Sequence, residues 1–599
     1  PLDTTGRGER LLDVLAGRAF VPLRTAGETV VFLAPRHLAW VRTRADVCAA
    51  THVRHEQSGE LLDRRMRCLD QQRDAARALA DVLATPGDPV VVDKAVDAVA
   101  GLGAAASCAT VAGDGVPPPA DPAQRAEIER LTLAISEVKA MYLAGRMAAA
   151  NDAVAGLRAP VTATGFAALQ AALLTVQGVL QLDAGKAAEG EKSLDAAAGL
   201  AAQARDPVLE VRAWVPLFLA VVIAQQRVAD TDIVLRAASS ALVRSNGQPP
   251  AQRVDLMRFH ALAEAQRGRF AKAIELADAA LAATIEADPD APRFRFYQAQ
   301  ARVRIDAGRP AEAVAPLRAA LAEIDARLGP AHPGAAQVLA TLGGVLRGEG
   351  DYAGARAAYA RALAIYEGVY GARGQPTVGP LNGLAALAAA ENQFDDAIGL
   401  MRRVIAISEA QGPDSPGLAT LLQNLGGMLT EAQRPAEAIP HLRRAVALHE
   451  RALGPDAVEL GWTSSTLGRA LRETGQRPEA RIAQAQALAI LEGAYGPIHG
   501  AVAYPLEELA ELELLDGRAR SAVALAERAV AARTTGPSEP RELAAARYLL
   551  ARALYAQGRD RDRARAVGRQ AADELRALDD SDVSEVDAWL AKVGAPRGP

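Results

Sequence analysis

Three residues near the start of the chain have side chains that could bind a metal ion. Cys48, His52 and His55 are spaced at about one helical turn, so a thiolate and two imidazoles could share one helix face. Zinc sites usually draw their ligands from two segments of a chain, however. We therefore favour a structural helix with exposed histidines and predict no metal site.

Two other motifs match cofactor-binding or catalytic patterns only in part. The sequence GLGAAA from Gly101 has the glycines of a dinucleotide loop, but it lies in an alanine-rich helical stretch and no ribose-binding acid follows. SEVK from Ser136 has the SxxK nucleophile spacing without a KTG partner.

A pair of histidines on one predicted helix is a further candidate for metal binding. His441 and His449 lie about 12 Å apart along that helix, however, which is too far for one metal ion. We predict no cofactor and no catalytic residue, and we do not expect an enzyme.

Four carboxylates lie close together in the sequence, at Glu507, Glu508, Glu511 and Glu513. Such a group could supply an acid–base pair. Acidic runs on the helices of repeat proteins are usually solvated, and we expect a solvated helix face here.

The composition favours helices and identifies no partner. The 599 residues are too many for one hydrophobic core, and with 4% aromatic residues the burial must come mainly from Ala, Leu and Val. A net charge of −5 provides no bulk positive field for nucleic acid or an anionic membrane. The most apolar stretch, Trp214–Ala224, is about half as long as a membrane span, and the first residues lack a signal-peptide pattern.

The cysteines Cys48, Cys68 and Cys108 are few, odd in number and without CxxC spacing. This set argues against a disulfide scaffold and against a structural zinc site, and it favours the reducing conditions of a cytoplasmic protein. The chain begins with Pro1, so we expect a processed product or a piece of a longer protein.

A repeated sequence pattern runs through most of the chain, so any functional side chains must be positioned by its helices. Short turn-like segments such as EGDYAGA and QRPAEA recur, and each ends in an alanine, which we call a marker alanine. The clearest markers are Ala355, Ala397, Ala438, Ala480 and Ala522, separated by 42, 41, 42 and 42 residues. Further copies end at Ala273 and Ala313, and fainter ones carry a turn at Gly145 and Gly185, giving about eleven units.

Each unit reads as helix, tight turn, helix. A large residue followed by a small one stands before each marker alanine, as in Leu425-Gly426, where two helix axes should approach closely. Gly or Asn in the turn tolerates the left-handed backbone that ends the first helix. Units close with Gly-Pro, as in LGPAHP from Leu328, which stops one helix and lets the next begin.

These residues resemble tetratricopeptide repeats, and the 42-residue period with LGPxHP resembles the kinesin light chain variety. The resemblance covers about 125–575 and implies an all-α, right-handed solenoid of helical hairpins. We expect the amphipathic stretch Ser581–Gly594, within a C-terminal segment 576–599, to cap the array with Trp589 and Leu590 facing inward.

A smaller helical module precedes the array. We expect helices at 36–56, 59–83 and 91–106 within a module at 36–112, followed by a proline-rich linker at 113–124; residues 1–35 remain unassigned. The module resembles the segment that joins the catalytic domain to the repeats in large bacterial serine/threonine protein kinases of myxobacterial type. The matching positions are Trp40, Cys48, Glu56, Gln57, Ser58, Leu61, Leu62, Asp63, Arg65, Met66, Cys68 and Leu69.

That resemblance implies a kinase domain N-terminal to this sequence. The sequence itself contains no glycine-rich loop, HRD, DFG or APE motif, so catalysis is not carried over. We expect a protein–protein interaction module of a bacterial signalling protein. The alternatives are a stand-alone scaffold or co-chaperone and an enzyme with an unrecognised site, which would need a deep polar cleft.

In such solenoids the first helix of each unit lines the concave surface, where an extended peptide can lie. Residues 18, 15, 11 and 8 positions before each marker alanine should face that groove. This count selects Arg295, Gln298, Arg302, Gln337, Arg347, Asn382, Gln423, Trp462, Arg469, Arg472 and Tyr504. Arginine, amide and aromatic groups suit an acidic or carboxylate-bearing segment of a partner protein, and an ordinary solvated helix face is the alternative.

Overall fold

The fold was analysed in a computed structural model. It describes residues 24–25, 28–29, 34–83, 98, 102, 105–110, 116–246, 250–287, 291–412, 416–535, 539–578 and 580–594. The described residues form an all-α repeat fold that divides into two compact units, 1–358 and 359–599, with the division inside helix α16 (Tyr352–Tyr370).

The first unit begins with a small module. A two-residue antiparallel pair, β1 (Arg24–Thr25) and β2 (Glu28–Thr29), precedes helices α2 (Ala34–His52) and α3 (Gly59–Leu83) and the short 3₁₀ helix η1 (Ala105–Thr110). The predicted helix at 36–56 thus ends four residues early, and most of the predicted helix at 91–106 lies outside the described residues.

The module is held together by contacts between its helices. The indole Nε1 of Trp40 donates a hydrogen bond to the Leu69 carbonyl at 2.7 Å. Cys68 and Cys108 form a disulfide with their Cα atoms 5.6 Å apart, and only Cys48 is free. Our argument against a disulfide was wrong for this pair, because their side chains meet from α3 and η1 although they are 40 residues apart in sequence.

Helices then follow one another in pairs. The pairs and short connecting helices of the first unit are α5 (Pro122–Leu143), α6 (Met147–Ala163), α7 (Ala167–Asp183), α8 (Ala187–Gln203), α9 (Pro207–Phe218), the π-helical η2 (Leu219–Ala224), η3 (Val228–Asp230), α10 (Thr231–Arg244), α11 (Pro250–Gln266), α12 (Phe270–Ala287), α13 (Phe294–Asp306), η4 (Pro310–Ala313), α14 (Val314–Leu328) and α15 (Pro333–Gly348).

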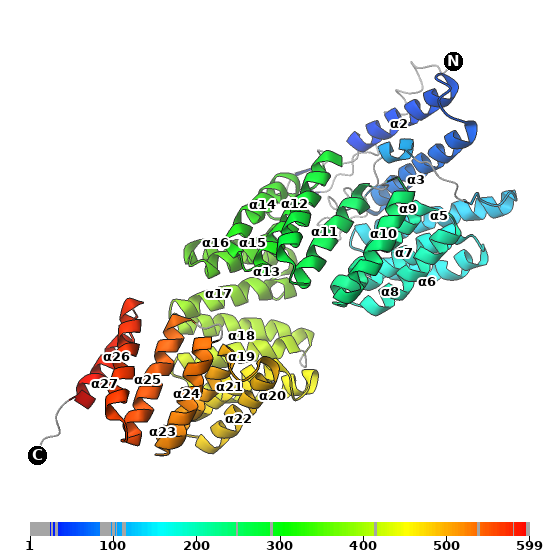
Figure 1. Ribbon diagram of the computed structural model, residues 1–599. Helices are drawn as coiled ribbons and strands as arrows, with labels where there is room; N and C mark the ends of the chain where they lie inside the picture. Colours follow the sequence, from blue (N-terminus) through cyan, green and yellow to red (C-terminus); the bar gives the residue numbers. More distant parts are fainter. Residues whose placement is uncertain are drawn as a thin grey trace, which may run out of the picture. The chain divides into compact units, whose positions relative to one another are not determined.

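The second unit continues the pattern from within α16. Its elements are η5 (Gln375–Thr377), α17 (Val378–Ala390), α18 (Phe394–Gln411), α19 (Pro416–Glu431), α20 (Pro435–Leu453), α21 (Val458–Glu473), α22 (Arg477–Tyr495), α23 (Gly500–Leu515), α24 (Ala519–Thr535), α25 (Pro540–Gln557), α26 (Arg561–Ala577) and α27 (Val583–Gly594). From α5 to α26 the chain makes eleven pairs, and Figure 1 shows the helices of each unit stacked side by side.

The marker alanines lie where the two helices of a pair meet. All five of the clearest markers are fully buried, as are Ala273 and Ala313. Gly426 lies so close to Leu442 of α20 that an added Cβ would overlap that side chain, and Gly178 meets Leu194 in the same way. The predicted close approach at the small residue is confirmed.

The turns use the left-handed backbone that the sequence predicts. Gly475 has φ 78° and Asn392 has φ 60° at equivalent turns. Gln433 adopts φ 60° in a third turn. This turn departs from the expectation that Gly or Asn holds the left-handed position. Gly454 (φ 92°) and Gly496 (φ 85°) end α20 and α22, as the Gly-Pro motif predicts.

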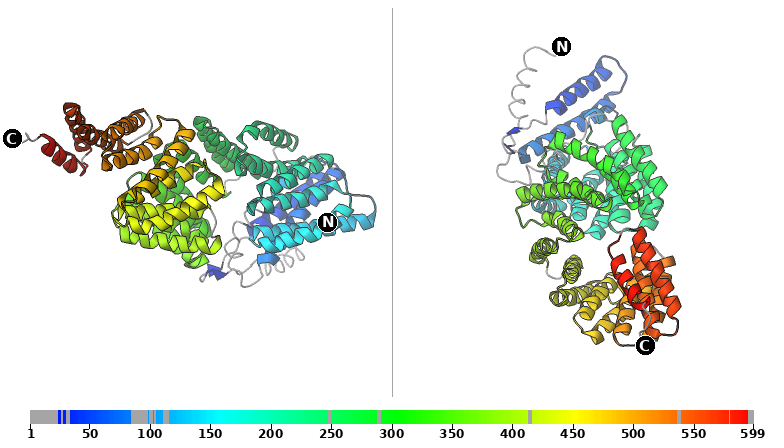
Figure 2. Two further views of the ribbon diagram at one scale, coloured as in Figure 1. Left: turned by 90° about the horizontal axis from the view of Figure 1, so that it is seen from below. Right: turned by 90° about the vertical axis from the view of Figure 1, so that its left-hand side faces the viewer.

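Within each unit, successive first helices pack against one another more closely than successive second helices do, as along α19, α21, α23 and α25. The closer row lies on the inside of a curved stack, so the first helices line the concave side of each unit and the second helices the outer side. Figure 2 gives two further views of these stacks.

Ion pairs join successive second helices in the second unit. Arg402 pairs with Glu437 at 3.3 Å, Arg443 with Glu479 at 2.5 Å and Arg563 with Glu527 at 2.7 Å. The partners are 35 or 36 residues apart in every case. We call this set the outer ion-pair ladder.

The last helix, α27, closes the second unit. Trp589 lies edge-on to Tyr548 at 5.8 Å and to Tyr555 at 5.9 Å between ring centroids, and its ring reaches Gly568 of α26. Leu590 packs against the same core as Ala571 and Leu575. Trp589 and Leu590 therefore face inward, as the sequence predicts.

One helix of the described residues is long and apolar enough to cross a membrane by length and composition, at Pro207–Ala224. It is longer than the stretch Trp214–Ala224 considered from the sequence, because it also includes the first seven residues of α9, 207–213. Half of it is buried in the fold, where Val211, Val215 and Phe218 pack against α8, α10 and α11. Packing between repeat helices accounts for its apolar character.

Candidate partner-binding surface

The eleven residues selected from the sequence all lie on first helices, and none of them is buried. In the first unit they fall on α13 and α15, at Arg295, Gln298, Arg302, Gln337 and Arg347. In the second unit they fall on α17, α19, α21 and α23, at Asn382, Gln423, Trp462, Arg469, Arg472 and Tyr504. We call the solvent-facing side of the first helices, on which these residues lie, the first-helix face of each unit.

Two aromatic rings meet at the centre of the first-helix face of the second unit. Trp462 of α21 and Tyr504 of α23 contact edge to face, with 5.4 Å between ring centroids. The Tyr504 ring is covered on another side by the guanidinium of Arg533, 4.1 Å from its centroid, and its hydroxyl donates to Glu542. The Tyr504 residue is still 38% exposed. The pair therefore offers a fixed aromatic surface to solvent.

Arg533 ties this aromatic surface to the helices behind it. Its side chain is buried and pairs with Glu507 at 3.0 Å and with Glu542 at 2.6 Å. Burial raises the pKa of Glu507, an effect that the Arg533 guanidinium opposes. Burial, together with the hydrogen bond to Glu542, also raises the pKa of the Tyr504 hydroxyl. Tyr504 is consequently neutral at physiological pH.

The arginines of this face are paired with carboxylates. Arg472 binds Glu508 at 2.6 Å, and Arg469 binds Glu473 at 3.1 Å. The sequence-based count missed Glu508, which approaches from the next first helix. The expectation of an arginine-rich groove therefore needs correction, since an incoming anion must exchange with these carboxylates. Arg469 is the more accessible, with 44% of its side chain exposed.

The expectation of a solvated acidic face on α23 was wrong. Besides Glu507 and Glu508, Glu511 pairs with Arg552 at 2.5 Å. Glu513 is buried and binds Arg518 at 2.6 Å. The carboxylates form part of the packing between α23 and its neighbours.

A buried polar chain lies beneath Gln423. The Thr463 hydroxyl donates to Gln423 Oε1 at 2.7 Å, and His449 Nδ1 lies 2.9 Å from the same Thr463 oxygen. His449 is only 1% exposed. From the sequence His449 was considered only as a metal ligand, and Thr463 was not considered, yet together they fix the orientation of the Gln423 amide.

The first-helix face of the first unit is also partly neutralised. Arg302 binds Asp306 at 2.9 Å, and the Arg295 guanidinium lies 5.7 Å from the centroid of the Phe294 ring. Gln337 and Arg347 are exposed on α15.

Within the part of the chain that the structure describes, no three His, Cys, Asp or Glu side chains come together as metal ligands. Cys48, His52 and His55 do not share one helix, because α2 ends at His52 and His55 adopts φ 55°.

Comparison with known proteins identifies the repeat. The family model described as "Tetratricopeptide repeat" matches residues 296–368, 377–450 and 423–493. This stretch consists of tetratricopeptide repeats. The matched segments contain nine of the eleven selected residues, and Arg295 and Tyr504 lie outside them. No curated protein matches the chain.

Parts of the chain are also similar to solved structures. BtubC (BKLC) from P. vanneervenii is 19% identical, with a TM-score of 0.33, over 37% of this chain and 91% of that one. A putative kinesin light chain from Podosopora anserina with nearly identical TPR-like repeats is 23% identical, with a TM-score of 0.31, over 34% and 97%. The apo form of RapI is 15% identical, with a TM-score of 0.46, over 62% and 98%.

The pairs before residue 296 share the tetratricopeptide geometry although the family model does not match them. Ala150 of α6 is fully buried at the marker position, and Lys139 of α5 lies 11 residues before it, on the first-helix face. Lys139 reaches solvent, yet burial within the fold lowers its pKa to about 8, helped by the nearby Arg212. Among the described residues neither cation has an ion pair. Extending the count to this faint repeat would have found Lys139.

Proposed function

We propose that this chain is a protein-interaction module whose first-helix faces bind extended segments of partner proteins. We further propose that it is the regulatory region of a bacterial serine/threonine kinase signalling protein and acts in the cytoplasm. The tetratricopeptide repeats support the first statement, and the resemblance of residues 36–112 supports the second.

The contact between Trp462 and Tyr504 carries the proposal of a binding face. Aromatic and arginine side chains dominate the binding energy of protein interfaces, and here they stand in fixed positions on an open helix face. The pair contacts Arg533 and Glu542 from behind, so little side-chain entropy would be lost when a partner binds.

The charges of these faces favour an acidic partner segment. Arg469 is accessible beside the aromatic pair, and Lys139 and Arg212 lie together without an ion pair in the first unit. A carboxylate that binds Arg472 must displace Glu508, which makes binding dependent on salt and on the number of partner carboxylates.

A photo-crosslinking residue placed at Arg469 tests the binding face. The matched control carries the same residue at Ile482, which is 71% exposed on the second helix α22. We expect a discrete crosslinked partner from position 469, and we expect Trp462→Ala to abolish it without unfolding the chain. Crosslinks from position 482 alone would contradict the proposal.

Two further measurements test the finer statements. A synthetic peptide rich in Asp and Glu should compete with the crosslinked partner, while its Asn and Gln counterpart should not.

The kinase context has a separate test. The reading frame that contains this sequence should encode glycine-rich loop, HRD and DFG motifs upstream of Pro1. A frame without those motifs would leave the stand-alone scaffold as the better interpretation.

A further inference from the structure

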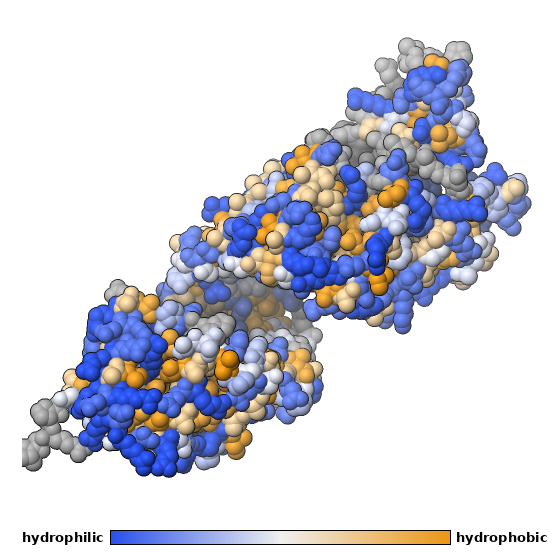
Figure 3. Space-filling view, viewed as in Figure 1, coloured by the Kyte–Doolittle hydropathy of each residue, from blue (hydrophilic) through white to orange (hydrophobic). Residues whose placement is uncertain are grey.

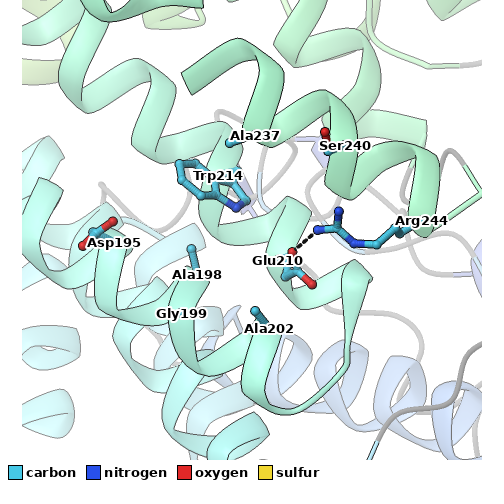
Figure 4. A pocket seen from close by; sticks show the side chains of 9 residues that line it. All are labelled: Asp195, Ala198, Gly199, Ala202, Glu210, Trp214, Ala237, Ser240 and Arg244. Atoms are coloured by element: carbon cyan, nitrogen blue, oxygen red, sulfur yellow. Dashed lines mark hydrogen bonds and ion pairs between the residues drawn. The ribbon is translucent and has the colours of Figure 1, made fainter. Parts of the chain in front are cut away.

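A cavity of about 350 Å³ lies between α8, α9 and α10 of the first unit (Figure 4). Its walls are the second helices α8 and α10, and its floor is α9. Trp214 projects into it, whereas Arg212, two residues earlier on α9, lies about 200° around the helix on the first-helix face. The cavity is therefore on the outer side of the unit, away from the proposed binding face.

The cavity exists because the facing side chains are small. Ala198 and Ala202 of α8 and Ala237 of α10 line it. A Cβ added to Gly199, which also lines the cavity, would meet no atom within 4 Å. The indole of Trp214 thus stays partly exposed between these small residues.

The two ends of the cavity differ in charge. At one end the guanidinium of Arg244 binds the buried carboxylate of Glu210, as Figure 4 shows. At the other end Asp195 is exposed on α8, and none of the described residues forms an ion pair or a hydrogen bond with its carboxylate. The cavity therefore has one neutralised carboxylate and one free carboxylate, on either side of an aromatic ring.

We propose that this cavity binds an arginine side chain of a partner protein, with the guanidinium between Asp195 and the Trp214 indole. A guanidinium can stack on an indole and donate two hydrogen bonds to a carboxylate at once, and its aliphatic stem suits the small apolar walls. Arg244 already makes one of these contacts within the chain, since its guanidinium binds the Glu210 carboxylate at the edge of the cavity.

The surface beside the cavity provides contacts for the rest of such a segment. Ile233 is 63% exposed and lies on the same face of α10 as Ala237 and Ser240, and Val243 is 80% exposed nearby. Figure 3 shows hydrophobic residues at the surface in the region of α9 and α10. Both the location and the charge of the ligand differ from the acidic segment proposed above, so either proposal can fail alone.

The test uses the full chain labelled with 5-fluorotryptophan, whose four tryptophans give four ¹⁹F resonances. Trp214→Phe assigns the reporting resonance. The probes are the peptide Ac-Ala-Arg-Ala-NH₂ and its citrulline counterpart, which has the same shape without the charge. We expect the arginine peptide to shift the Trp214 resonance alone, with a Kd about tenfold lower than that of the citrulline peptide.

Three variants sharpen the result. Asp195→Asn should raise the Kd about tenfold, and Gly199→Leu should abolish the shift by filling the cavity. Asp152→Asn removes an equally exposed carboxylate from α6 and should leave the Kd unchanged. A silent Trp214 resonance, equal shifts from both peptides, equal shifts of all four tryptophans, or full binding by Asp195→Asn would each overturn the proposal. The remaining three resonances report whether every variant is folded.

Discussion

Gly426 of α19 lies directly against the side chain of Leu442 of α20, so that an added Cβ would overlap it. Gly427, the next residue, has no atom within 4 Å of the corresponding position. These two neighbouring glycines therefore separate two effects on stability, the close packing of α19 against α20 and the low helix propensity of glycine.

Gly426→Leu should lower the free energy of unfolding by about 1–3 kcal/mol, because the extra side chain forces α19 away from α20. Gly427→Leu should leave stability unchanged or raise it by up to about 1 kcal/mol, since leucine is the better helix former. Thermal melts of the two variants check this. Equal melting temperatures would show that the pair register is wrong.

Removing the Trp589 ring should destabilise the end of the second unit. Trp589→Ala takes away the contacts with Tyr548 and Tyr555 and should cost up to about 3 kcal/mol. Deletion of 581–599 should also lower solubility, because it uncovers Ala571 and Leu575. Lys592→Ala, an exposed change on the same helix, is the control. Unchanged melting of the truncated chain would mean that α27 caps nothing.

Glu513 predicts how stability responds to acid. The Arg518 guanidinium, together with Arg481, holds the pKa of Glu513 below its ordinary value although burial opposes this. A lowered folded-state pKa stabilises the fold above the unfolded pKa, and that stabilisation is lost as pH falls through the folded pKa. The wild type should therefore lose stability below about pH 4.5.

Glu513→Gln should cost about 1–3 kcal/mol at pH 7 and flatten the acid limb of the stability curve. Denaturant unfolding at several pH values between 7 and 3 measures both effects. Glu479→Gln changes an exposed carboxylate on the preceding repeat and should leave the curve almost unchanged. A parallel loss in wild type and Glu513→Gln would assign the acid response to other groups.

The disulfide makes a prediction about thiol reactivity. In protein purified without a reductant, an alkylating reagent should modify Cys48 alone, and after reduction and unfolding it should modify all three cysteines. Cys68→Ser should destabilise the N-terminal module by about 2–4 kcal/mol, whereas Cys48→Ser should have little effect. Modification of all three cysteines without reduction would show that the bond does not form in the protein as isolated.

Most of the fold was accessible from the sequence because a tetratricopeptide pair is specified locally. The marker alanines, the small residue at Gly426 and the turn glycines each act within one pair, so a column at constant spacing reveals them. The left-handed backbone at Gln433 could not be predicted in this way, because it is imposed by the helices on either side of the turn. The π-helical η2 likewise shifts the register of α9 in a way that spacing alone does not reveal.

The candidate surface was predictable in position but not in charge. Counting from the marker alanines placed Trp462 and Tyr504 on first helices, and their contact follows from the packing of α21 against α23. The pairing of Arg472 with Glu508 joins residues 36 positions apart on two different helix pairs, so a count confined to one helix pair could not find it. The disulfide between Cys68 and Cys108 is missed for the same reason.

The outer ion-pair ladder has a consequence for how such a chain can change over evolutionary time. Arg402 and Arg443 each meet a glutamate of the following second helix at nearly the same spacing, whereas Arg563 meets a glutamate of the preceding one. Gene duplication or loss of the 42-residue segment that carries both Glu437 and Arg443 would therefore place an arginine opposite a glutamate again. At this point the array can lengthen or shorten by a whole pair, with the new junction already compatible, while the residues exposed on each first helix diverge independently.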